Sequence, residues 1–220
     1  WWVILSSALA INCISCTEET VPTGFIEDFE KASYTEQAHV QIRQIGNWEY
    51  DSGMALLAFP GYGEFSVSAL DLPGKGKLPG RLTMLATFSK NDVLNKNNWE
   101  VGFKLGHEYT VEVQLNHLGH VSFIDSGGNH LTSIPESRQA IDLKEWSSFS
   151  LKIEVFDETN HSIVATLIHS NNELFLAASD DIPLDFDKAE FNTSVFIKGQ
   201  GTGYLALDYW QIWPNWVTPD

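Results

Sequence analysis

The sequence predicts an all-β protein, built as a two-sheet antiparallel sandwich of the jelly-roll type. Its clearest signal is strict alternation of apolar and polar residues, which is typical of half-buried antiparallel strands. Clusters rich in glycine, proline and asparagine interrupt the chain at short intervals, as the turns of a sandwich do. No window of a dozen residues keeps helical spacing convincingly. The alternation is most regular at 99–105, 109–115 and 149–155.

Further strands are predicted where alternation is weaker but β-branched and aromatic residues gather. These segments are Val40–Ile45, Met54–Phe59, Glu64–Leu70, Leu82–Phe88, Ser162–Ile168, Leu174–Ala177, Ser194–Lys198 and Tyr204–Trp213. The turn clusters between the predicted strands lie at 60–63, 72–80, 95–98, 125–129 and 170–172. Because no linker interrupts the middle of the chain, we expect a single sandwich domain over residues 24–216.

The composition supports a large core and excludes several partners. Of 220 residues, 43% are hydrophobic and 12% aromatic, which is ample for a packed interior. The net charge of −16 and a pI near 4.6 argue against nucleic acid and anionic membrane surfaces, which repel such a chain. The same charge disfavours acidic polysaccharides, unless a local basic patch or a bound cation intervenes. No motif indicates an organic cofactor.

The N-terminal residues resemble an export signal. The stretch Val3–Cys16 is apolar, rich in small residues and too short to span a membrane. The chain starts at Trp1 without a basic segment, so we expect that the start is truncated. Both cysteines lie in this stretch, so the folded domain has no disulfide framework.

The end of this stretch resembles a bacterial lipobox. Ser15 stands where the small residue before the cut is found, and Cys16 where the lipidated cysteine is found. Cys13 departs from the leucine that such motifs usually carry. The resemblance implies an export segment at 1–16, a tether at 17–23, and a lipoprotein that meets the outer membrane or cell surface only through its lipid. Plain secretion and a buried helix are the alternatives. We also expect the domain to be a monomer.

A second resemblance covers nearly the whole domain. Gly24–Glu30 opens it, Gly46–Gly53 follows, Trp146 comes much later, and Tyr204–Ile212 closes it. This order resembles the concanavalin A-like lectin/glucanase superfamily, in which the first and last strands pair near the termini. Members include lectin-like modules, laminin G-like modules and glycosidases. The Glu-x-Asp-x-x-Glu strand of the catalytic branch is absent from this sequence.

The best-defined candidate site is a predicted hairpin with its turn centred on 106–108. That register places Glu100 opposite Gln114, Gly102 opposite Glu112 and Lys104 opposite Thr110. Polar side chains would surround a hole at the glycine, where a ligand could approach closely. The alternative is a solvated face on which Lys104 balances its carboxylates. The predicted sugar-binding residues, with aromatic rim residues included, are Trp48, Tyr62, Glu100, Lys104, Glu112 and Gln114.

An enzymatic alternative uses the same hairpin. In the predicted register Glu100 and Glu112 are diagonal neighbours, ~5–8 Å apart, which overlaps the carboxylate spacing of retaining glycosidases. A working pair also needs one acid with a raised pKa.

Two further carboxylates are candidates for a structural calcium site. Glu27 shares the alternation phase of Phe25, and Asp208 shares that of Ala206 and Trp210. A carboxylate on an apolar phase needs a partner, because an unpaired buried charge is costly. The superfamily resemblance implies a calcium ion where the first and last strands meet. A salt bridge to an arginine or lysine is the alternative.

These observations together favour an exported, non-catalytic carbohydrate-binding module. The two rival hypotheses are a glycosidase that uses the glutamate pair and a structural or adhesive surface protein.

Overall fold

The computed structural model describes residues 25–30, 41–68, 81–90, 98–132, 140–143, 146–156, 162–179, 181–182, 184 and 191–214. These residues form an antiparallel β-structure without an α-helix, so no described helix is long and apolar enough to cross a bilayer. The strands are β1 Phe25–Glu27, β2 Ile42–Ile45, β3 Trp48–Asp51, β4 Met54–Ser68, β5 Arg81–Lys90, β6 Asn98–Gly106, β7 Val111–Asn116, β8 Val121–Asp125, β9 Ser148–Phe156, β10 Ser162–His169, β11 Asn172–Ala178 and β12 Asn192–Pro214.

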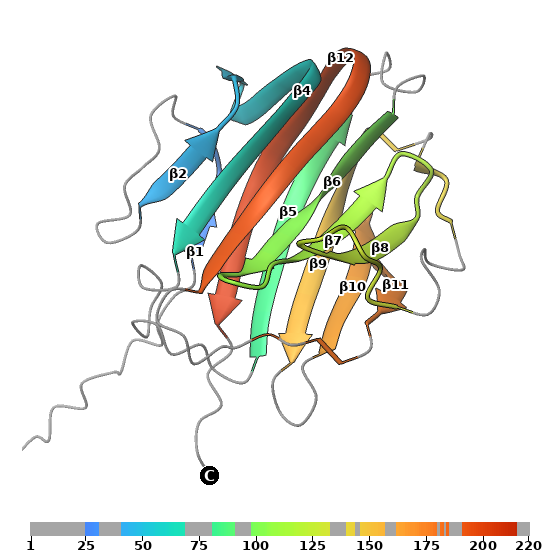
Figure 1. Ribbon diagram of the computed structural model, residues 1–220. Helices are drawn as coiled ribbons and strands as arrows, with labels where there is room; N and C mark the ends of the chain where they lie inside the picture. The colour runs from blue at the N-terminus through green and yellow to red at the C-terminus, as the bar shows by residue number, and fades with distance from the viewer. Residues whose placement is uncertain are drawn as a thin grey trace, which may run out of the picture.

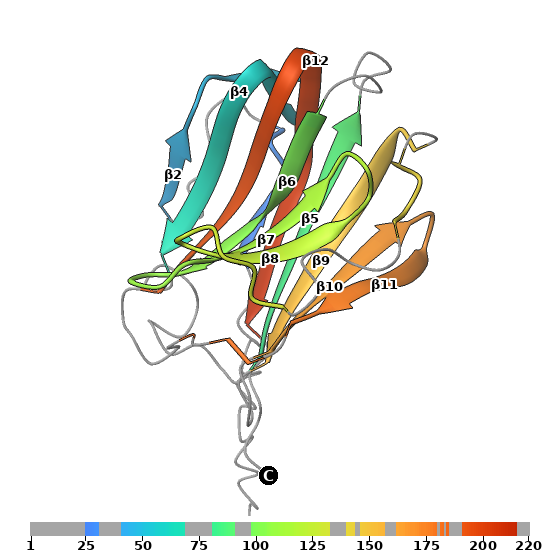
Figure 2. The same cartoon turned by 45° about the vertical axis from the view of Figure 1, so that its right-hand side comes forward.

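The strands form two layers that share two long strands (Figure 1, Figure 2). The front sheet contains β2, the second half of β4, the first half of β12, and β6, β7 and β8. The back sheet contains β3, the first half of β4, the second half of β12, and β1, β5, β9, β10 and β11. The predicted jelly-roll sandwich is therefore confirmed.

Strands β4 and β12 bend together from one sheet into the other. Their mutual register breaks between Gly199 and Gly203, and a Cβ at Gly199 would lie 2.3 Å from the ring of Phe59. The glycine thus permits the close approach that the bend requires. The sequence predicted a turn at 60–63 with a separate strand on either side, and this prediction was wrong. Glycine and proline here mark a bend within the continuous strand β4.

The core lies between the two sheets and is formed by the apolar phase of each strand. Phe65, Phe103 and Val113 come from the front sheet, and Phe88 and Ile153 from the back sheet; all are fully buried. Burial of each large apolar side chain is worth roughly 1.5–3 kcal/mol. The opposite phase of the front strands is mainly polar, with Phe196 on β12 as an exception, and forms the outer face of the molecule.

Candidate functional site

The β6–β7 hairpin has a longer turn than the sequence predicted. Leu105 pairs with Val111, not with Tyr109, so the register differs by two residues from the prediction. The reason is that β6 continues through Gly106, which has a φ of 117°, and four residues rather than three then connect Gly106 to the start of β7 at Val111. A shift of two preserves the facing of every side chain. The predicted core and polar faces of the hairpin are therefore correct, although the predicted neighbours are not.

The corrected register separates the two glutamates of the enzymatic alternative. Glu100 lies opposite Asn116, and Glu112 lies opposite Lys104, four positions away along the strands. At about 3.4 Å per residue this places the two backbones ~13 Å apart. Retaining glycosidases hold their carboxylates about 5–5.5 Å apart and inverting ones about 6.5–9.5 Å. Glu100 instead pairs with Lys198 at 2.8 Å, so the predicted diagonal pair is wrong.

Lys104 is the centre of a polar cluster on the outer face of the front sheet. Its Nζ lies 3.1 Å from Glu64 Oε2 and 3.6 Å from Glu112 Oε1, and donates a hydrogen bond to the Tyr62 hydroxyl. Tyr62 donates in turn to Glu64, while Gln114 Nε2 donates to Glu112 at 2.8 Å. The structure thus brings together Tyr62, Lys104, Glu112 and Gln114 from the predicted set, and adds Glu64.

The surroundings fix the ionisation of this cluster. Burial would lower the pKa of Lys104, but the hydrogen bond to Tyr62 and the Glu64 carboxylate together raise it above its ordinary value. Burial raises the pKa of Tyr62 to about 12, and its hydrogen bond to Glu64 adds to the effect. Near neutral pH the lysine is therefore charged and the phenol is protonated.

The hole predicted at Gly102 is not open to a ligand. Gly102 is buried, and its direct neighbour on β12 is the fully buried Phe196. A Cβ at Gly102 would lie 1.8 Å from the Val113 carbonyl oxygen. The glycine therefore serves the close approach of β6 to β7. Tyr62 stacks over Phe196, with ring centroids 6.3 Å apart, and covers this part of the face.

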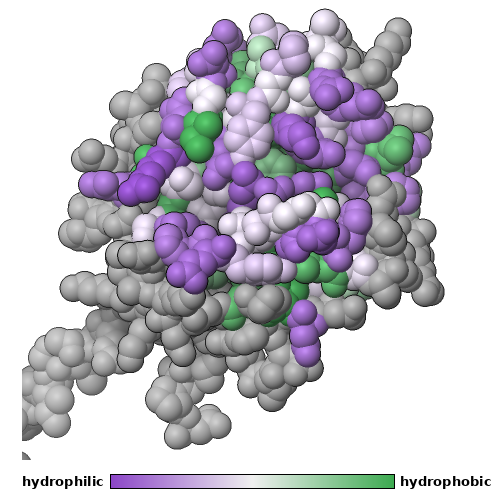
Figure 3. All heavy atoms as spheres, viewed as in Figure 1, coloured by the Kyte–Doolittle hydropathy of each residue, from purple (hydrophilic) through white to green (hydrophobic). Residues whose placement is uncertain are grey.

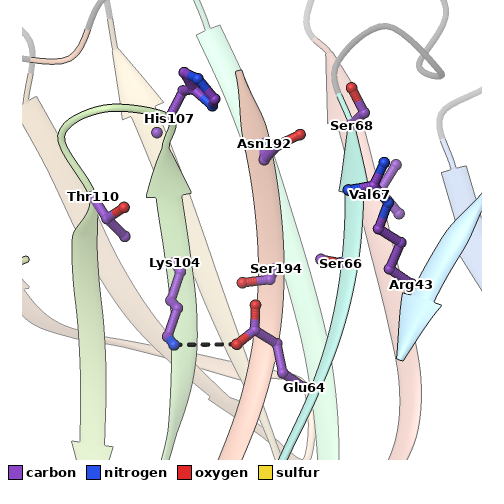
Figure 4. A pocket seen from close by; sticks show the side chains of 11 residues that line it. Arg43, Glu64, Ser66, Val67, Ser68, Lys104, His107, Thr110, Asn192 and Ser194 are labelled. Carbon is purple, nitrogen blue, oxygen red and sulfur yellow. Dashed lines mark hydrogen bonds and ion pairs between the residues drawn. The ribbon is translucent and has the colours of Figure 1, made fainter. Parts of the chain in front are cut away.

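A concave feature of the face lies one row further along the strands. Arg43, Ser66, Ser194 and Lys104 are successive cross-strand neighbours on β2, β4, β12 and β6. Two short serine side chains between two long cationic ones leave a hollow of about 230 Å³. Figure 4 shows Lys104 and Arg43 on opposite sides, with the two serines between them. We call this feature the serine hollow.

The lining of the serine hollow is mainly polar. Glu64 and Asn192 add a carboxylate and an amide to the lining, and Thr110 and His107 contribute from the β6–β7 turn. Hydrophilic residues cover much of the surrounding face (Figure 3). Hydroxyl, amide, carboxylate and guanidinium groups together offer both donors and acceptors to a hydroxyl-rich ligand.

The predicted aromatic rim is only partly present. Trp48 is 9% exposed and belongs to the core, where its ring lies 4.6 Å from that of Phe65. Its indole N–H donates to the Ile45 carbonyl at 2.9 Å. Trp48 therefore presents no stacking surface, because its place on β3 turns the ring inward. Tyr62 alone of the predicted rim residues lies beside the polar cluster.

The two predicted calcium ligands lie in different settings. Glu27 is 3% exposed, pairs with Trp210 in the β1–β12 ladder, and accepts the Phe29 N–H at 2.8 Å. Asp208 is the extra residue of a bulge between Leu207 and Tyr209.

The bulge corrects the phase predicted for Asp208. Leu207 faces the core before the bulge, and Trp210 and Ile212 face it afterwards. Asp208 therefore does not share the alternation of the core-facing residues on either side of the bulge. Burial raises the pKa of both carboxyl groups. The part of the chain that the structure describes contains no group of three or more His, Cys, Asp or Glu placed to hold a metal. These two residues thus gain no third such ligand there, and calcium binding stays a prediction.

Lys104 is the one predicted sugar-binding residue in the lining of the hollow. Arg43, Glu64, Ser66 and Ser194 are among the lining residues that were not predicted from the sequence. The available signal was the alternation at Glu64 and Ser66 around the buried Phe65. It shows that these side chains face outward but does not reveal which strands lie beside them. The export segment 1–16, the tether 17–23 and the lipidation site Cys16 lie outside the described residues.

Comparison with known proteins gives a match in structure and none in sequence. The sequence matches no protein-family model and no curated protein. The metal-free carbohydrate recognition domain of Emp46p matches with a TM-score of 0.62 at 11% identity, over 88% of this chain and 97% of that one. The Ca²⁺/Man2-bound exoplasmic/lumenal domain of VIP36 matches with a TM-score of 0.56 at 8% identity, over 90% of each chain.

A plant protein gives a similar result. Lectin II from Ulex europaeus matches with a TM-score of 0.55 at 10% identity, over 86% of this chain and 97% of that one. Likenesses at such low identity establish the fold and not the activity. The chain therefore has the jelly-roll sandwich of these lectin domains, and the concanavalin-like fold expected from the sequence is confirmed.

Proposed function

We propose that this protein is an exported carbohydrate-binding module that holds its ligand in the serine hollow. The observation that carries the proposal is a polar, open hollow on the outer face of a lectin-fold sheet. Its volume of about 230 Å³ is below the ~300–1,000 Å³ typical of drug-sized ligands, so it suits one sugar unit. The fold supports this reading by analogy, because similar domains include lectins.

The chemistry of the hollow favours sugar over an apolar ligand. The Ser66 and Ser194 hydroxyls and the Asn192 amide can exchange hydrogen bonds with sugar hydroxyls. The Glu64 carboxylate, held in place by Lys104 and Tyr62, is an acceptor whose position is fixed before any ligand arrives. Fixed polar groups lower the ordering cost of binding.

Export and anchoring form the second part of the proposal. The apolar stretch ending in Ser15 and Cys16 supports secretion with a lipid on Cys16. The VIP36 domain of similar fold is itself an exoplasmic/lumenal domain. A monomer on the outer membrane or cell surface would present the front sheet to external glycans.

Filling the hollow tests the proposed site. Ser66→Tyr should block it and weaken binding by about tenfold or more, a loss of at least ~1.4 kcal/mol. The measurement is binding of the folded domain to an array of immobilised glycans, followed by titration calorimetry with the strongest ligand.

Ser122→Tyr is the matched control, because Ser122 lies on the same outer face but on β8 and outside the hollow. It should leave binding unchanged. Equal affinity of wild type and Ser66→Tyr would show that sugar binds elsewhere, and an array without any bound glycan would overturn the proposed function itself.

A further inference from the structure

The serine hollow is an exception to the charge of the chain. The protein has 13 Lys and Arg against 29 Asp and Glu, so its overall field repels anions. The lining of the hollow nevertheless includes two permanent cations, Arg43 and Lys104, and a single carboxylate, Glu64. An anionic ligand would therefore meet a favourable local charge here only if one of these cations is available to it.

Lys104 is not the available cation. It lies within 4 Å of both Glu64 and Glu112, so its charge is already balanced within the sheet. Its hydrogen bond to Tyr62 holds the ammonium group further. Lys104 thus orients the acceptors on its own side of the hollow.

Arg43 stands on the opposite side and is exposed. Three strand spacings of about 4.8 Å separate its backbone from that of Lys104, roughly 14 Å in all. No carboxylate of the described residues forms an ion pair with Arg43. Its guanidinium fork is therefore available, and this group matches the bidentate geometry of carboxylate and of sulfate or phosphate oxygens.

Resting on the proposed function, we infer that the ligand of the serine hollow is an acidic saccharide, with Arg43 binding its anionic substituent. The serines and Asn192 then contact the neutral hydroxyls, and Glu64 accepts a hydrogen bond from a sugar hydroxyl on the far side. One end of the hollow is cationic and the other carries the acceptor, so the site orients a sugar that bears a charge at one ring position.

The test uses a glycan array that presents matched neutral, uronic-acid and sulfated members of each backbone. We expect the acidic members to bind best, and Arg43→Gln to weaken them by about tenfold or more, as expected for loss of a charged hydrogen bond. Preference for uronic acids or for sulfated members identifies the anionic group. Added salt should weaken binding of wild type more than that of Arg43→Gln.

Lys198→Gln is the matched control. It removes one positive charge from the same face, at an exposed ion pair with Glu100 outside the hollow, and should change affinity less than twofold. If neutral members bind as well as acidic ones and Arg43→Gln binds like wild type, this inference is wrong while the proposed function stands. If no glycan binds, both are wrong.

Discussion

At the scale of single residues, neighbours distant in sequence decide what a side chain does. The sequence predicted that Lys104 would balance carboxylates, and Glu112 is indeed one of them. The nearer partner, Glu64, lies 40 residues earlier and could not be predicted, because pairing of β4 with β12 and of β12 with β6 is a property of the sheet. The prediction that Trp48 lies on an exposed rim was wrong for a similar reason, because its ring packs against Phe65 of the neighbouring strand β4.

Glu27 is a buried residue whose setting makes the stability of the fold depend on pH. Burial raises its pKa; the hydrogen bond from the Phe29 N–H opposes this, and the charge of Asp28 adds to it. The folded protein therefore binds this proton more tightly than the unfolded chain, whose glutamate pKa is about 4.3. The stabilising contribution of protonated Glu27 is fully present below the pKa that this residue has in the unfolded chain. It is lost as pH rises through the higher pKa of Glu27 in the folded protein.

Glu27→Gln should raise the melting temperature at neutral pH in the presence of a chelator. The amide is uncharged and of the same size, and its oxygen can still accept the Phe29 N–H. The difference from wild type should disappear in acid, where Glu27 is protonated. Thermal melts of both proteins at about pH 4 and pH 7 measure it.

The calcium hypothesis predicts a different pattern for the same pair of proteins. Calcium at a hundredfold over its dissociation constant would stabilise wild type by ~2.7 kcal/mol, and Glu27→Gln should lose that gain. A variant less stable than wild type in chelator at neutral pH would contradict the buried-carboxylate account.

At the scale of elements, alternation predicts facing far better than register. The strands around Val101, Val113 and Ile153 were predicted with the correct core faces, because the apolar residues of a single strand alternate within a short stretch of sequence. The register between β6 and β7 was predicted wrongly, because it depends on the length of the turn after Gly106. The short strands β3 and β8 were not among the segments predicted as strands.

The close approach of β6 and β7 gives a prediction for Gly102→Ala. The new Cβ would collide with the Val113 carbonyl oxygen, so the strands must separate. We expect a loss of about 1–3 kcal/mol, in the range of other overpacking substitutions. Each kcal/mol corresponds to roughly 2–4 °C in melting temperature for a domain of this size.

Gly127→Ala serves as the control in the exposed turn after β8. There the new Cβ would meet side-chain atoms of Asn129 and Asp125 at 3.1 and 3.2 Å and no backbone atom, a much smaller overlap than at Gly102. Its effect should stay within about 0.5 kcal/mol. Equal stability of Gly102→Ala and wild type would show that Gly102 is not needed for the approach of the two strands.

At the scale of the whole molecule, the fold creates the candidate site by bringing four strands side by side. Arg43 and Lys104 are 61 positions apart in the printed sequence, and Ser194 lies much later still. Only the path of β12 between β4 and β6 places them in one row. The sequence could therefore predict a polar outer face, but not the hollow within it.

The most direct test of the account is to map a bound glycan onto the front sheet by NMR. The ¹⁵N-labelled domain is titrated with the strongest ligand from the array, and backbone amide shifts are followed. We predict that the largest changes fall on Arg43, Ser66, Ser194 and Lys104, while β9 and β10 of the back sheet stay unchanged. Shifts concentrated on the back sheet, with none around the serine hollow, would contradict the account.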